Sequence, residues 1–126
     1  MRYLLDTTLL IDHARGKPGA IELVEELFSE PNDLYTCDAI VVEALSSGGE
    51  DERLVIEALI RPLEYVSTSP GAARWAGASR RAAARTSPRR LGDAIIAAVA
   101  WSLQATVVTR NPRDFEIQGV SVLAYD

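Results

Sequence analysis

Short apolar runs alternate along the chain with longer stretches in which apolar residues recur at helical spacing. The short runs predict strands at residues 2–5, 34–36, 63–67, 105–109 and 120–124. The longer stretches predict helices at 8–15, from Ile21 to just before Pro31, and at 38–46, 50–60, 71–85 and 91–103. Glycine and proline mark the breaks, and Asn111-Pro112-Arg113 is expected to be a turn.

This order of elements predicts an α/β fold. Strands separated by helices need crossover connections, which give a mostly parallel sheet with helices on its faces. We expect a three-layer α/β/α architecture with a central sheet of four to five strands, formed by one domain over residues 1–126. Ligands of such sheets bind at the carboxyl ends of the strands, so functional side chains are expected at that edge.

The composition is that of an ordinary globular protein. Of the 126 residues, 48% are hydrophobic and 25% are charged, which is enough to form a sizeable core. No apolar run approaches the roughly 18 residues that span a bilayer, and Asp6 comes too early for a signal peptide. A single cysteine, Cys37, excludes an internal disulfide and a cysteine-based zinc site. We expect the protein to act in the cytoplasm.

Four acidic residues lie against apolar segments. Asp6 and Asp114 follow predicted strands, Glu43 lies in an apolar helical stretch, and Asp93 opens the last long helix. Each alone is better explained as a helix cap, a turn residue or an exposed residue than as a ligand. Together, at one edge of a sheet, such carboxylates are costly unless a positive charge neutralises them. Oxygen ligands from several elements suit Mg²⁺, so the set predicts a divalent cation and chemistry on phosphate.

The net charge of −5 hides a division between the two halves of the chain. Residues 1–64 carry 14 acidic and 5 basic residues, whereas residues 65–126 carry 4 acidic and 8 basic ones. The segment from Tyr65 to Gly92 has no acid and contains the arginines Arg74, Arg80, Arg81, Arg85, Arg89 and Arg90. A solvated helix face explains such a stretch about as well as a phosphate-binding surface, but a stripe of one sign suits a phosphate backbone.

Several other chemistries lack the residues they need. His13 is the only histidine, so a nuclease that uses two histidines as acid and base is excluded, and Cys37 has no plausible histidine partner. No glycine-rich phosphate-binding motif occurs. A phospho-acceptor domain of receiver type needs a late lysine, and the only lysine is Lys17. Trp75 and Trp101 are expected to be packing residues.

Four segments together resemble the PIN-domain ribonucleases, and in size and order the chain is similar to the VapC toxins of toxin–antitoxin pairs. The segments are Leu4–Asp12, Val42–Leu45, Gly92–Ala98 and Thr109–Phe115. The last two, at their mutual spacing, are the most specific. The resemblance implies a PIN-like fold and a Mg²⁺- or Mn²⁺-dependent endoribonuclease that acts as the toxin of a type II pair.

The resemblance also implies roles for individual residues. The core metal-site acids of the family correspond to Asp6, Glu43 and Asp93, and Asp114 corresponds to a fourth acid whose participation varies. Thr8, Thr109 and Asn111 match polar positions that shape the same site. Cys37 stands where serine or threonine is common before the helix, so Asp38 is expected to cap that helix instead.

We expect the acids to hold one or two metal ions that activate water, and the arginines to bind flanking phosphates. The resemblance implies a small antitoxin that covers the enzyme and can place an arginine in the acidic site, within a homodimer or a hetero-oligomer. Leu23, Leu27 and Phe28 are candidates for its groove, although core packing explains them equally well. The alternative function is a PIN-like scaffold that binds RNA or a partner without cutting.

Overall fold

The structure is a computed structural model that describes residues 1–83 and 89–126. The elements are β1 (Arg2–Leu5), α1 (Thr7–Ala14), α2 (Pro18–Ser29), β2 (Asp33–Cys37), α3 (Asp38–Leu45), α4 (Glu50–Ile60), β3 (Glu64–Val66), α5 (Pro70–Ala83), α6 (Leu91–Leu103), β4 (Thr106–Thr109), α7 (Pro112–Glu116) and β5 (Val122–Ala124). Arg85, one of the predicted RNA-binding arginines, lies outside the described residues.

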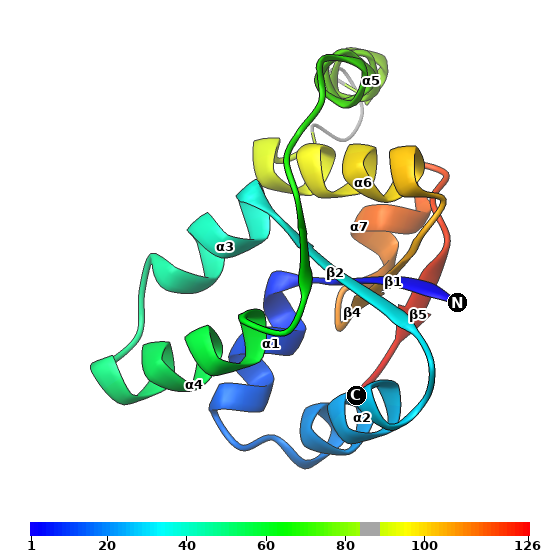
Figure 1. The fold of residues 1–126 in the computed structure, drawn as a ribbon. Helices are drawn as coiled ribbons and strands as arrows, with labels where there is room; N and C mark the ends of the chain where they lie inside the picture. The colour runs from blue at the N-terminus through cyan, green and yellow to red at the C-terminus, as the bar shows by residue number, and fades with distance from the viewer. Residues whose placement is uncertain (84–88) are drawn as a thin grey trace.

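The strands form one parallel sheet in the order β3-β2-β1-β4-β5, as the α/β prediction requires (Figure 1). The central strand β1 pairs with β2 on one side and β4 on the other, with Leu5 beside Val108 in the register. Helices α1, α2 and α4 lie on one side of the sheet, and α6 and α7 lie on the other (Figure 1). The predicted three-layer architecture is therefore confirmed.

The strand order places a topological switch point between β1 and β4. The chain leaves β1 toward β2 on one side, whereas β4 leads to β5 on the other, and a crevice forms where such connections diverge. Asp6 stands at this point, directly after β1, and its backbone N–H donates to the carbonyl of Val108 at 3.0 Å. The first candidate acid is thus fixed at the ligand-binding edge by the sheet itself.

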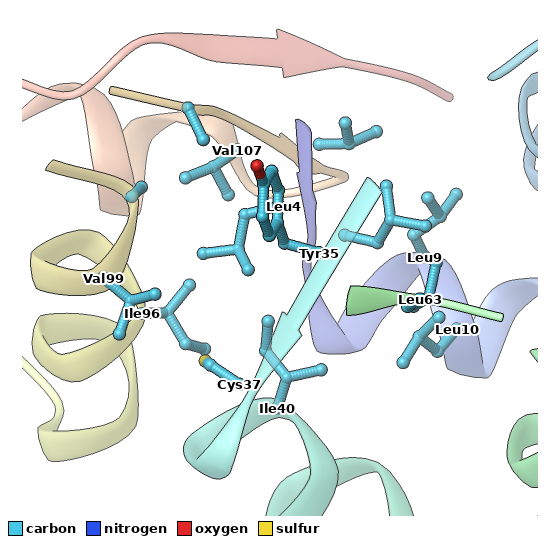
Figure 2. Packing of buried hydrophobic residues seen from close by; sticks show 14 of the residues in the cluster. Leu4, Leu9, Leu10, Tyr35, Cys37, Ile40, Leu63, Ile96, Val99 and Val107 are labelled. Carbon is cyan, nitrogen blue, oxygen red and sulfur yellow. The ribbon is translucent and has the colours of Figure 1, made fainter. Parts of the chain in front are cut away.

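Both faces of the sheet are apolar because each is covered by helices. The side chains of Leu4 on β1, Tyr35 on β2 and Val107 on β4 pack with Ile96 and Val99 of α6 (Figure 2). Leu4 and Val107 have no exposed surface. Such runs of buried apolar residues explain why the strands appear in the sequence as short continuous apolar segments rather than as alternating ones.

Cys37 belongs to this core (Figure 2). Burial raises the pKa of its thiol to about 11, so the side chain stays neutral at physiological pH. Cys37 therefore packs as a small apolar residue. Asp38, however, does not cap α3 as expected, since its carboxylate accepts hydrogen bonds from the Tyr65 hydroxyl and the Thr68 backbone N–H, at the end of β3.

Two further sequence-based boundaries are wrong. The expected turn at 111–113 is the start of the short helix α7, in which Pro112 takes the first position, where no backbone N–H is needed. The last strand is shorter than expected and covers Val122–Ala124. None of the described helices has the length and hydropathy of a membrane span.

The basic helix α5 packs closely on α6 through small residues. Ala72 and Ala76 lie against Ala94 and Ala98, and all are almost fully buried. Trp75 stacks on Trp101 beside them, with ring centroids 5.7 Å apart and an angle of 19° between the rings. The packing role expected for the tryptophans is confirmed, although half of the Trp101 surface remains exposed. The arginines of α5 are therefore carried by a helix that is seated directly on the helix bearing Asp93.

Leu4→Ala tests the contribution of the core under β1. The variant is expected to lose about 2–5 kcal/mol of unfolding free energy, because the buried side chain leaves a cavity between two covered faces. Leu54→Ala makes the same change on α4 at a side chain that is 62% exposed, and should stay within about 0.5 kcal/mol of wild type. Urea unfolding followed by circular dichroism measures both, and equal losses would contradict the packing described.

Candidate active site

Asp6 is an almost fully buried carboxylate that is held by two hydroxyl groups. Only 4% of the residue is exposed. Its Oδ2 accepts hydrogen bonds from Thr109 Oγ1 at 2.7 Å and from Thr8 Oγ1 at 3.1 Å. Although Asp6 precedes α1, its side chain makes no capping hydrogen bond. The two hydroxyl donors, rather than the helix end, therefore fix the position of this carboxylate.

The hydroxyl protons are directed toward Asp6 because each hydroxyl oxygen accepts a backbone N–H from the segment after β4. Thr8 Oγ1 accepts from the Arg110 N–H at 3.1 Å, and Thr109 Oγ1 accepts from the Asn111 N–H at 3.0 Å. A threonine hydroxyl has one proton, which remains available for the carboxylate. All three predicted polar residues therefore help to position Asp6. Thr8 and Thr109 do so through their side chains, and Asn111 does so through its backbone N–H.

Glu43 approaches the same edge from α3. Its Oε1 accepts a hydrogen bond from Thr7 Oγ1 at 3.0 Å. Its Oε2 lies so close to Gly92 that a Cβ atom there would stand 2.6 Å away. The carboxylate of Glu43 on α3 therefore lies directly against the backbone at the start of α6, next to Asp93.

Asp93 lies in the first turn of α6 and is half-buried. Burial, with the negative charges of Asp114, Asp6 and Glu43, raises the pKa of its carboxyl to about 6, and the charge of Arg90 opposes this rise. Burial also raises the pKa of Asp6 above its usual range, although its hydroxyl donors oppose the rise and the charge of Glu43 adds to it. The acids predicted from the sequence therefore interact electrostatically as one site.

The four carboxylates lack a basic partner within the described ranges. The ion pairs found there join Arg15 to Glu52, and Lys17 and Arg110 to Asp12. Apart from the opposing charge of Arg90, the site keeps a net negative charge among the described residues. Its oxygen donors come from separate elements, which is the donor chemistry that a hard divalent cation needs. Over residues 1–83 and 89–126, no three of these side chains are already arranged as a ligand set. The donors therefore fit such a cation in chemical type, and they come from elements that meet at one edge of the sheet.

The arginines near the site fall into two groups. Arg74, Arg81 and Arg90 are exposed on α5 and at the start of α6. Arg89 is half-buried, and its guanidinium donates to the carbonyls of Ser79 and of Ile117. Arg80 Nε in turn donates to the carbonyl of Arg89 at 3.1 Å. Arg89 therefore joins α5 to the segment after α7, and its guanidinium is not a free surface cation.

Three residues of the site region were missed by sequence reasoning. Thr7 binds Glu43, as described above. Asp12 is 1% exposed and accepts from Tyr125 Oη at 2.7 Å and from Arg110 Nη1 at 3.1 Å. Gln118 lies behind Asp93 and Asp114. Asp12 could have been found in the sequence, because it is an acid on the buried face of helix 8–15, one turn after Leu9. The residues around Gln118 in the sequence give no sign of its contacts.

The raised pKa of Asp93 predicts a pH-dependent stability for metal-free protein. A carboxyl whose pKa rises from 3.8 unfolded to about 6 folded stabilises the fold below about pH 4, and this contribution is lost as the pH rises through 6. In the presence of a chelator at pH 7.5, Asp93→Asn should therefore raise Tm by about 4 °C, equivalent to about 1 kcal/mol after screening of a half-buried group.

The gain should be much smaller at pH 4, where Asp93 is protonated in the folded state and only partly ionised in the unfolded state. Scanning fluorimetry at the two pH values measures it, with Glu22→Gln on the exposed surface of α2 as the control that gains nothing. A lower Tm for Asp93→Asn at pH 7.5 would show that the repulsion between these carboxylates is absent.

The chain matches known proteins over most of its length. The PIN domain family model matches residues 3–119. A protein named Ribonuclease VapC19 from Mycobacterium tuberculosis is 32% identical over 114 residues, which are 89% of this chain and 90% of that protein.

Solved structures agree with the fold. VapBC2 from Rickettsia felis, bound to a DNA fragment from its promoter, superposes with a TM-score of 0.84 at 20% identity over 100% of both chains. DNA-bound VapBC from Salmonella typhimurium gives a TM-score of 0.75 at 28% identity over 98% of both chains. The match to the family model and the identity to VapC19 over most of both proteins lead to one conclusion: the chain belongs to the PIN domain family.

Proposed function

We propose that the protein is a metal-dependent endoribonuclease and the toxin of a type II toxin–antitoxin pair, formed by one PIN-like domain over residues 1–126. The observation that carries the proposal is the meeting of Asp6, Glu43, Asp93 and Asp114 at the switch-point edge, where none of them forms an ion pair with the described basic residues. The ribonuclease name of the relative from Mycobacterium tuberculosis supports the same activity.

The acids have different places in this mechanism. Asp6 is held rigidly by Thr8 and Thr109 and presents an oriented carboxylate. Glu43 is oriented by Thr7, and Asp114 is exposed on α7, where its side chain can adjust. Bound Mg²⁺, or Mn²⁺, supplies polarisation of the phosphodiester and activation of a water nucleophile. Asp6 is therefore positioned in advance, and Glu43, Asp93 and Asp114 would hold a divalent cation together with it.

Arginines of α5 and the start of α6 bind the RNA strand in this proposal. Arg74, Arg81 and Arg90 are exposed, and Arg80 belongs to the same surface, although its Nε is already bonded to a carbonyl. Contacts to phosphate give affinity that depends on salt and not on base identity. The same helix packs on α6, so RNA held by these arginines lies next to Asp93.

An antitoxin partner is supported by solved neighbours that are described as toxin–antitoxin assemblies, one from Klebsiella pneumoniae and one from Mycobacterium tuberculosis. Unpaired carboxylates attract a basic partner, and an arginine inserted there would make charge-assisted hydrogen bonds in place of the cation. Of the suggested groove residues, Leu27 is buried in the core and Phe28 is 39% exposed. Both residues line a surface hollow of about 330 Å³. Phe28 is the better candidate for contact with the antitoxin because of its greater exposure, in a homodimer or hetero-oligomer.

We place this activity in the cytoplasm, where cellular RNA and a co-expressed antitoxin meet. The alternative is a scaffold that binds RNA without cutting it. A scaffold has no need for a buried carboxylate that is oriented by two hydroxyl groups at a cost in desolvation. Calorimetric titration with Mg²⁺ separates the two functions, since a scaffold should show no binding that Asp6→Ala abolishes.

Asp93→Asn tests the proposed chemistry. The amide keeps the shape of the side chain but removes an anionic ligand, so Mg²⁺-dependent cleavage of RNA should fall at least about 100-fold while the protein stays folded. A fluorescent oligoribonucleotide measures cleavage, and circular dichroism checks the fold. Asp51→Asn, on the exposed first turn of α4, is the control that should cut like wild type. Equal cleavage by Asp93→Asn would contradict the assignment.

The arginine surface is tested by the double variant Arg74→Ala, Arg81→Ala. Removing two phosphate contacts should weaken RNA binding and reduce the slope of log affinity against log salt by about 0.7 for each contact, with kcat nearly unchanged. Arg61→Ala removes an exposed arginine at the end of α4 and should leave the slope as in wild type. Fluorescence anisotropy over a salt series measures binding, and identical slopes would place RNA elsewhere.

A further inference from the structure

We infer that Gln118 is a positioning residue that sets the distance between Asp93 and Asp114. The inference rests on the proposed function, because it concerns the affinity of the same acids for a divalent cation. Gln118 is 9% exposed and lies two residues after the end of α7, in contact with the backbones of Asp93 and Asp114.

The amide of Gln118 bonds to both acidic residues through their backbones. Its Nε2 donates to the Asp114 carbonyl at 2.8 Å and reaches the Asp93 carbonyl at 3.4 Å. Its Oε1 accepts a hydrogen bond from Ser79 Oγ of α5 at 3.1 Å. An amide nitrogen has two protons, so it can serve both carbonyls at the same time. One side chain therefore ties α6, α7 and the basic helix α5 together.

Asp114 needs such a tether more than the other acids do. It lies on α7, which has only five residues, and a helix of that length is not stable without tertiary contacts. Phe115 anchors one side of this helix in the core. On the other side, Arg89 Nη2 donates to the Ile117 carbonyl at 2.9 Å, and Gln118 follows immediately. Residues 117 and 118 thus fix the end of the helix that presents Asp114.

The polar nature of Gln118 points to alignment rather than to space filling. An apolar side chain of similar volume would fill the same place without the desolvation cost of an amide. Only the amide fixes the carbonyls of Asp93 and Asp114 at one distance from each other. The described acids are not arranged as a ligand set, so their side chains must move before they can bind a cation. The shorter the distance between the backbones of Asp93 and Asp114, the smaller that movement is.

Gln118→Met therefore has a defined expected effect. Methionine keeps the length and volume but donates no hydrogen bond, and the affinity for Mn²⁺ should fall about tenfold, at the low end for groups that support metal ligands. Ser79→Ala removes only the contact to Oε1, so its Mn²⁺ affinity should stay within about twofold of wild type. Val120→Ala removes half-buried packing next to Gln118 without touching these hydrogen bonds, and should lower Tm but not Mn²⁺ affinity.

The experiment is a titration of full-length, RNA-free protein with Mn²⁺, followed by electron paramagnetic resonance of free Mn²⁺, with Tm measured in chelator. Weaker binding by Gln118→Met alone supports the inference. Gln118→Asn, too short to reach both carbonyls, gives a second test and replaces Gln118→Met if that variant does not fold. Wild-type affinity in the folded Gln118 variants, or equal losses in Ser79→Ala or Val120→Ala, would overturn it. Absence of Mn²⁺ binding by wild type would instead overturn the proposed function.

Discussion

The burial of one carboxylate between two parallel strands organises this protein. Asp6 can remain at the end of β1 only because Thr8 and Thr109 donate hydrogen bonds to it, and these hydroxyls depend on the backbone after β4 for their orientation. The sheet order that brings β4 beside β1 is therefore part of the site. Desolvation of Asp6 remains costly even so, which makes a cation at this edge favourable.

Acidic and basic side chains occupy separate regions of the structure, as they do in the sequence. The acids come from four elements and meet at one edge, whereas the arginines are carried by the single crossover from β3 to β4. Alanine contacts allow α5 to lie directly on α6, which brings the basic surface next to Asp93. An enzyme for a polyanion needs both charges within reach of one strand of substrate, since the acids alone repel it. The small residues at the α5–α6 contact thus keep the arginines of α5 close to Asp93.

The sequence was sufficient for the parallel α/β architecture because each covered strand and helix has its own local pattern. The same order of elements predicted that Asp6, Glu43, Asp93 and Asp114 gather at the carboxyl edge of the sheet, and the charges of the other three help to raise the pKa of Asp93. Arg89 was grouped with the surface arginines, yet it donates to two carbonyls. Gln118 was not considered. The contacts of Arg89 and Gln118 depend on how α5, α6 and α7 pack together. The spacing of apolar residues along the sequence does not indicate that packing.

Thr109, the donor of the shorter of the two hydroxyl hydrogen bonds to Asp6, comes 103 residues later in the chain. During synthesis from the N-terminus, β1 and Asp6 emerge long before β4 exists, and the earlier strands β2 and β3 complete only one side of the sheet. A nascent chain that ends before Thr109 therefore lacks the donor, the paired strand and Asp114. The acidic site can therefore assemble only after Thr109 and Asp114 have been synthesised. A chain released before that point lacks the complete set of acids.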